Sequence, residues 1–165
     1  DDPWLKGEQG RTLRGLYDAA RRLNRELLVE IICSRHGNVG SHTVAQALRH
    51  LYELGIKPDW WKLEPQATPA AWEAIGETID RYDPWCRGIV VLGLEAPEEE
   101  LARAFRVAAR LPAVRGFAVG RTIFAAAARH WLAGAIDDGP AVEDMAERFS
   151  RLVDLWQAAR GAKAA

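Results

Sequence analysis

Two hydrophobic patterns alternate along the chain. Short, nearly continuous apolar runs, such as that at residues 27–33, are typical of strands buried on both faces of a parallel sheet, and longer segments carry apolar residues at helical spacing. The apolar runs predict four strands, at residues 27–33, 59–65, 87–94 and 114–119. The periodic segments predict helices at residues 12–23, 42–54, 69–82, 98–111, 122–135 and 141–159.

Several boundaries carry capping residues. Thr12 and Ser41 stand where they would cap the first two predicted helices, and Gly55 stands where the second would end. Thr68 followed by Pro69 predicts the start of the third helix, because proline suits the first helical position. The sequence therefore specifies helix starts as well as the helical periodicity.

Strict alternation of strands and helices predicts parallel strands joined by right-handed crossovers. Four such units are half of a (βα)8 barrel, a fold that typically has about 250 residues. We therefore expect an α/β chain that forms either the C-terminal half of a TIM barrel or a small open α/β sandwich. The 165 residues fit a single domain, with an N-terminal arm at residues 1–10 and a flexible tail at residues 161–165.

The second predicted strand carries an unusual lysine. Alternation of side chains along a strand places Trp60, Lys62 and Glu64 on one face. Lysine is rarely buried unless it is paired or functional, and burial lowers the pKa of its amine. A neutral amine attacks carbonyl carbons and forms Schiff bases. A structural Lys–Glu ion pair explains the same pattern, so both interpretations stand.

Glu30 lies in the middle of the first predicted strand, within the apolar run of residues 27–33. An unpaired carboxylate is costly to ionise in such a place, and the amine of Lys62 on the neighbouring strand is its natural partner. An acid beside an amine can shuttle protons during carbinolamine formation. A buried ion pair without catalytic function is the alternative.

Polar or glycine residues follow the ends of the strands, where parallel sheets bind their ligands. Arg35 follows the first strand and could bind an anionic substrate. Gly93 ends the third strand, and Gly120 with Arg121 ends the fourth and opens a helix. Glycines let a phosphate approach the backbone, and a helix N-terminus supplies free N–H donors. The alternative is that these glycines only permit tight turns.

Composition narrows the classes of partner. The net charge is −1 and no basic face stands out in the sequence, so nucleic acid is not an expected partner. The sequence contains no apolar run of about twenty residues, so it predicts no membrane span. No spacing of ligand residues predicts a metal site, and no cofactor is expected. Cys33 and Cys86 lie in apolar stretches, which favours reduced core thiols and a cytoplasmic protein.

Four stretches carry a family resemblance: LLVEII at 27–32, GIKPDWWKLEPQ at 55–66, CRGIVVLGL at 86–94 and GFAVGRTIF at 116–124. They resemble the C-terminal domain that is fused to bacterial 5-dehydro-2-deoxygluconokinases of myo-inositol catabolism. That domain is similar to class I aldolases of the tagatose-bisphosphate type, which are (βα)8 barrels. The resemblance covers essentially the whole chain.

The resemblance implies roles for individual residues. Lys62 matches the Schiff-base lysine and Glu30 the glutamate that assists proton transfer. Gly93, Gly120 and Arg121 match the site for the substrate phosphate. The implied reaction is cleavage of 5-dehydro-2-deoxy-6-phosphogluconate to dihydroxyacetone phosphate and malonic semialdehyde, without a metal or other cofactor.

The chain departs from that family in one large respect: it matches only the second half of the domain. We therefore expect a fragment or half of a split barrel, whose outer strands expose unpaired backbone edges. Such a chain would form a homo-oligomer or pair with the missing half-barrel or the kinase portion. A non-catalytic phosphosugar-binding or scaffolding domain is the alternative function.

Overall fold

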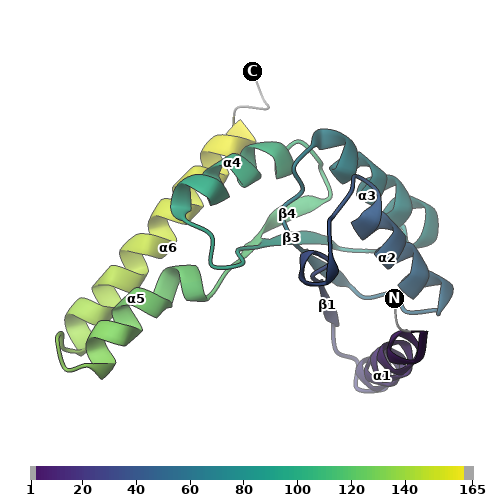
Figure 1. Ribbon diagram of the computed structural model, residues 1–165, viewed down its shortest axis with the longest axis horizontal. Helices are drawn as coiled ribbons and strands as arrows, with labels where there is room; N and C mark the ends of the chain where they lie inside the picture. Colours follow the sequence, from purple (N-terminus) through teal and green to yellow (C-terminus); the bar gives the residue numbers. More distant parts are fainter. Residues whose placement is uncertain (1–2, 162–165) are drawn as a thin grey trace.

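The computed structural model describes residues 3–161, which form one sheet with six α-helices and one short 3-10 helix around it (Figure 1). The elements follow one another as α1 (Pro3–Arg22), β1 (Leu28–Ile31), η1 (Ser34–His36), α2 (Thr43–Glu53), β2 (Trp60–Leu63), α3 (Pro69–Tyr82), β3 (Gly88–Leu92), α4 (Glu98–Ala108), β4 (Val114–Ala118), α5 (Arg121–Leu132) and α6 (Asp138–Gly161).

The four strands form an open parallel sheet in the order β1-β2-β3-β4. The predicted α/β class and the predicted parallel alternation are therefore confirmed, and the open sheet is consistent with half of a barrel. Each strand is shorter than predicted, because pairing stops where the chain turns into the next loop. The register places Glu30 directly opposite Lys62, and Lys62 opposite Val90.

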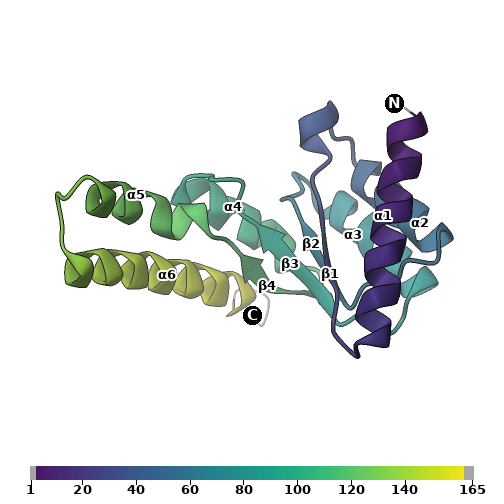
Figure 2. The ribbon, with the colours of Figure 1, turned by 90° about the horizontal axis from the view of Figure 1, so that it is seen from below.

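Helices cover only one face of this sheet. Helices α2, α3, α4 and α6 pack on the convex side, and the concave side carries no helix within residues 3–161 (Figures 1 and 2). The core between the layers includes Trp61, Leu63 and Ile89, none of which has measurable solvent exposure. The expectation that the first strand is buried on both faces is wrong, because Leu28 and Glu30 point to the uncovered side.

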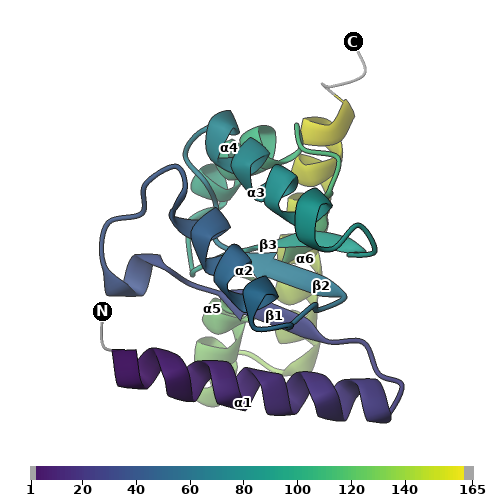
Figure 3. The ribbon, with the colours of Figure 1, turned by 90° about the vertical axis from the view of Figure 1, so that its right-hand side faces the viewer.

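The first helix begins nine residues earlier than the predicted cap at Thr12. Helix α1 starts at Pro3, so the described part of the expected arm is helical. Two interactions with the end of α2 explain the extension. Gly10 is buried so close to Leu54 that a Cβ would lie 2.9 Å from its Cδ1, and Arg14 donates to the Leu54 carbonyl over 3.1 Å. Helix α1 runs along the β1 edge of the molecule (Figure 3).

Helices α5 and α6 form an antiparallel hairpin that projects away from the sheet (Figure 2). The apolar stripe predicted on the last helix is divided. Leu152 is buried in the core and Trp156 packs edge-on against Phe105, with 5.5 Å between ring centres. Val142 is 64% exposed and Phe149 is 50% exposed, although the Phe149 ring lies 6.2 Å from that of Phe117 on β4.

One of the predicted caps is confirmed and another is wrong. The Thr68 hydroxyl accepts a hydrogen bond from the Ala71 N–H over 3.3 Å at the start of α3. Helix α2 begins at Thr43 instead of after Ser41, and the Thr43 hydroxyl accepts from the Gly40 N–H.

Helix α6 continues to Gly161, so that residue of the expected tail is helical, and residues 162–165 lie outside the described part of the chain. None of the described helices has both the length and the apolar character that crossing a membrane requires.

Candidate active site at the carboxyl ends of the strands

Lys62 and Glu30 meet on the concave face of the sheet. Their side chains extend from directly opposed positions on β2 and β1, and the Lys62 Nζ lies 3.3 Å from the Glu30 Oε2. The Lys62 side chain keeps 25% of its surface exposed and that of Glu30 keeps 40%. The predicted partnership is therefore present. The predicted burial of Glu30 is not, because nothing in the described chain covers this face.

Glu64 does not join this pair, although simple alternation predicted that it would. Strand β2 ends at Leu63, and the backbone then turns the Glu64 side chain into the protein, where the residue is 3% exposed. Its carboxylate accepts hydrogen bonds from the backbone N–H groups of Cys33 and Ser34, at 2.8 Å and 3.2 Å. Glu64 thus ties the end of β2 to the loop after β1.

Arg35 lies in that same loop, within η1, and its side chain is exposed. The loop starts at the two N–H groups that Glu64 holds, so the position of Arg35 depends on the end of the neighbouring strand. Arg35 stays a predicted anion-binding residue at the carboxyl edge of the sheet.

Gly93 and the Gly120–Arg121 turn come together at the ends of β3 and β4. A Cβ at Gly93 would lie 2.7 Å from Val119 Cγ1 and 3.3 Å from the Thr122 hydroxyl. A Cβ at Gly120 would lie 3.2 Å from the Phe124 ring. Close packing inside the chain favours glycine at both positions, and it holds the start of α5 against β3.

A small hollow opens beside this turn, with a volume of about 270 Å³. The described loop after β3, the start of α4 and helices α5 and α6 form its walls, and no residue of β1 or β2 contributes. Its charged lining residues are Glu95, Glu98, Arg121, Arg129 and Arg148. The periodicity of the helices did not mark Arg129 or Arg148 as candidates, because arginines are common on solvated helix faces.

The loop beside the hollow has an uncommon backbone. Leu94 and Glu95 both adopt left-handed backbone conformations, with φ of 48° and 63°. Residues other than glycine and asparagine rarely take these conformations. This turn brings the Glu95 carboxylate to Arg121, the first residue of α5, and the two form an ion pair. Arg121 is thus already neutralised in part by its own chain.

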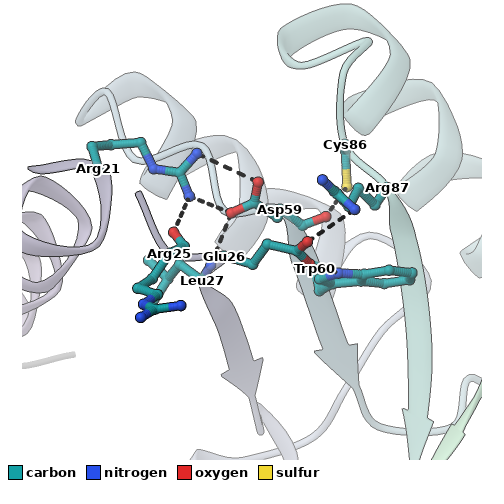
Figure 4. Close-up of polar contacts among 8 residues, drawn as sticks. All are labelled: Arg21, Arg25, Glu26, Leu27, Asp59, Trp60, Cys86 and Arg87. Atoms are coloured by element: carbon teal, nitrogen blue, oxygen red, sulfur yellow. Dashed lines mark hydrogen bonds and ion pairs between the residues drawn. The ribbon is translucent and has the colours of Figure 1, made fainter. Parts of the chain in front are cut away.

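The amino ends of the strands hold a separate polar cluster (Figure 4). Asp59 accepts hydrogen bonds from the Arg21 guanidinium and from the Leu27 N–H, the latter over 2.8 Å. Burial acts to raise the pKa of Asp59, but these donors outweigh burial and hold the pKa below the ordinary value of 3.8. Asp59 therefore links the end of α1 to the starts of β1 and β2.

Glu26 extends the same cluster toward β3. Its carboxylate accepts from the Trp60 indole N–H over 2.8 Å and pairs with Arg87 at 2.9 Å (Figure 4). Cys86 lies next to it, and burial raises the pKa of this thiol to about 11. Burial also raises the pKa of Cys33. Neither cysteine has the lowered pKa of a nucleophilic thiol.

The structure brings the predicted site residues together in two groups. Lys62 and Glu30 form one on the concave face, and Gly93, Gly120 and Arg121 form the other at the ends of β3 and β4. No hydrogen bond or ion pair between described residues joins the two groups. Both lie on the carboxyl half of the sheet, opposite the Asp59 cluster.

A family model matches residues 1–160, with the description "uncharacterized protein conserved in bacteria (DUF2090)". The match spans almost all of the 165 residues. The chain belongs to this bacterial family. No curated protein matches the chain. The DUF2090 family is conserved in bacteria, and its description assigns no activity to the chain.

Proposed function

We propose that this DUF2090 chain is a class I aldolase domain in which Lys62 forms a Schiff base with a phosphorylated keto-sugar acid. The observation that supports the proposal is the Lys62–Glu30 pair, with 3.3 Å between amine and carboxylate, in the middle of two neighbouring parallel strands. The pair lies on the uncovered face of the sheet with 25% and 40% of the two side chains exposed, so the amine stays accessible to a substrate beside a carboxylate that can exchange its proton.

The proposed chemistry uses both partners. Transfer of the Lys62 proton to Glu30 leaves a neutral amine, which adds to the C5 ketone carbon of 5-dehydro-2-deoxy-6-phosphogluconate, and loss of water leaves an iminium ion. Glu30 supplies the proton that the departing water needs. The resulting carboxylate then acts as base on the C3 hydroxyl, the C3–C4 bond breaks, and its electrons enter the iminium as an enamine. Protonation and hydrolysis of the enamine release dihydroxyacetone phosphate, and malonic semialdehyde is the other product.

The substrate phosphate is proposed to bind at the second group of residues. Arg121 supplies charge and the first N–H groups of α5 supply hydrogen-bond donors, with Gly93 and Gly120 holding the helix start against β3. Arg35 would contact the carboxylate end of the substrate. A substrate anion has to compete with Glu95 for Arg121, because the two residues form an ion pair.

Borohydride trapping tests the proposal directly. The chain is incubated with dihydroxyacetone phosphate, reduced, and digested for peptide mass spectrometry. We expect a reduced adduct on Lys62, none in Lys62→Met, and an unchanged Lys62 adduct in the matched control Lys57→Met, whose lysine is exposed in the loop before β2. A wild-type chain without an adduct, or an adduct that persists elsewhere in Lys62→Met, contradicts the assignment.

A second candidate function is a phosphosugar-binding domain without catalysis. The hollow beside Arg121, Arg129 and Arg148 favours it, because these charges lie apart from the Lys62–Glu30 pair. This alternative expects phosphate binding that is lost in Arg121→Ala, survives Lys62→Ala and is accompanied by no borohydride adduct. Both functions place phosphate at Arg121, which calorimetric titration with inorganic phosphate measures, so the borohydride adduct on Lys62 is the result that separates them.

A further inference from the structure

The concave face of the sheet is unusual for parallel strands. Parallel sheets almost always have both faces covered, whereas the described helices of this chain pack against the convex side of its sheet alone (Figure 1). The open face carries the exposed Leu28 and the half-buried Trp60 and Val90 beside the Lys62–Glu30 pair. Apolar side chains on an open parallel sheet indicate that a second layer or further strands normally meet this face.

Both outer strands are also open along their backbones. Strand β1 pairs only with β2, and β4 pairs only with β3, among the described residues. The two edges are complementary. All strands run in the same direction and follow chain order across the sheet, so β1 is open on one side and β4 on the opposite side. A β1 edge can therefore continue a β4 edge as a further parallel strand.

Exposed apolar side chains gather at these same two ends. Leu16 of α1 and Leu23, the residue after α1, accompany Leu28 at the β1 end, and all three are more than 40% exposed. Helices α5 and α6 carry a comparable group at the β4 end, which consists of Phe124, Trp131, Leu132, Val142 and Phe149. Exposed apolar side chains that accumulate on the elements at both open edges are typical of interaction surfaces.

We propose that the partner is a second copy of this chain, and that two copies close into an eight-stranded parallel barrel. Eight is the number of strands at which a parallel sheet closes around an interior filled by side chains, and each copy supplies four. A two-fold axis parallel to the barrel axis preserves strand direction. It places β4 of each copy beside β1 of the other, so both open edges are paired at once.

The same closure covers the exposed apolar groups. Helix α1 lies along the β1 edge, and the α5–α6 hairpin lies beyond β4 (Figures 2 and 3). Joining β1 of one copy to β4 of the other therefore brings Leu16 and Leu23 toward the hairpin of the second copy. Neither end is left over, and the assembly stops at two copies.

Closure also completes the candidate site, and this consequence rests on the proposed function. In the dimer the Lys62–Glu30 pair faces the barrel interior, so the 25% exposure of the Lys62 side chain falls. Removal of water from an amine favours its neutral form. A Schiff-base lysine needs this neutral form to attack a carbonyl carbon. The single chain would hold the reacting pair, and the second copy would exclude water from it.

Sedimentation equilibrium measures the assembly without reference to activity. The wild-type chain, whose mass is 18.3 kDa, is expected to sediment at twice that mass. Hydrogen exchange is expected to show the paired amides of β1 and β4 protected as strongly as those of β2 and β3. A monomer, a larger open assembly, or a dimer with fast exchange in both outer strands would each overturn the barrel.

Two variants locate the interface, and a third controls for them. Leu28→Glu on β1 and Leu16→Glu on α1 are each expected to weaken dimerisation about tenfold or more, because each places a charge in an apolar contact. Trp85→Glu replaces an apolar side chain that is 88% exposed but lies between α3 and β3, away from both ends, and should leave the dimer intact. Circular dichroism checks folding, and Leu16→Glu is the decisive variant if Leu28→Glu unfolds.

The assembly test and the chemical test fail separately. A dimer without a Lys62 adduct keeps the barrel and refutes the aldolase. A monomer that still forms the adduct refutes the barrel and keeps the Schiff-base chemistry. Equal dimerisation by wild type, Leu16→Glu and Leu28→Glu also refutes the barrel, because its seam has to contain β1.

Discussion

At the amino ends of the strands Asp59 is enclosed, with 17% of its side chain exposed and donors from α1 and from Leu27, the residue before β1. At the carboxyl ends Lys62 and Glu30 share one contact and stay open to solvent at 25% and 40%. The first arrangement ties three elements together, and the second leaves an amine and a carboxylate accessible to solvent. The comparison teaches that polar pairs at the two ends of one small sheet can differ widely in burial and in the number of elements that they connect.

Glu64 shows that the division is not a simple matter of position. Glu64 lies at the carboxyl end of β2, yet it is 3% exposed, and its carboxylate accepts hydrogen bonds from backbone N–H groups of the loop after β1. It supports the mouth of the site without facing it. The carboxyl end therefore combines a rigid support at Glu64 with an accessible pair on the neighbouring face.

The largest expected effect comes from the accessible pair. Glu30→Gln removes the proposed proton shuttle and keeps the size of the side chain, so borohydride trapping of Lys62 should slow by about 10²-fold or more. The free energy of unfolding should change by less than about 1 kcal/mol, because ion pairs this exposed contribute little. Trapping rates and urea unfolding on the same samples measure both. A decrease in the free energy of unfolding as large as that expected for Asp59→Ala would contradict the contrast between the amino and carboxyl ends of the strands.

The next effect belongs to the amino ends. Asp59→Ala should lower the free energy of unfolding by about 2 kcal/mol, because the Leu27 N–H and the Arg21 guanidinium lose a charged acceptor. The Lys62 adduct should still form under conditions where the variant is folded. Glu53→Ala is a suitable control, since Glu53 makes an exposed ion pair with Arg49 on α2. Equal stability of the two variants would contradict a structural role for Asp59.

The smallest effect is in the pH dependence of stability. The folded-state pKa of Asp59 is held below 3.8, so its contribution is fully present above that pH and is lost as the pH falls through the folded pKa. The stability difference between wild type and Asp59→Asn should therefore shrink on acidification below pH 3.8. Urea unfolding at a series of pH values measures it, and a difference independent of pH would refute the ion pair.

The pKa of Asp83 is shifted in the opposite direction from that of Asp59, so its effect on stability with pH has the opposite sign. Burial raises its pKa above 3.8, so the charged carboxylate weakens the fold at neutral pH, and protonation relieves the penalty as the pH falls through the raised pKa. Asp83→Asn should be more stable than wild type at neutral pH, and the advantage should shrink on acidification. A variant that is less stable at neutral pH would show that its hydrogen bonds outweigh its burial.

Much of the fold was predictable from local pattern. Alternating runs predicted four parallel strands, and Thr68 with Pro69 predicted the start of α3, because both depend on neighbours in the sequence. The partnership of Glu30 and Lys62 was also predictable. A mid-strand acid and a mid-strand amine on consecutive parallel strands leave each other as the nearest counter-charge.

The rest depended on contacts between distant segments. The α-helical conformation of residues 3–10 is supported by contact with the end of α2 forty residues later, and the direction of Glu64 follows from the end of β2 and the loop after β1. Exposure was decided in the same way. Hydrophobic pattern alone predicted a covered sheet, but only the packing of α2, α3, α4 and α6 on the convex side shows that Leu28, Glu30 and Lys62 face the uncovered side. Sequence by itself determines which residues form a strand, whereas what covers that strand is a property of the assembled layers.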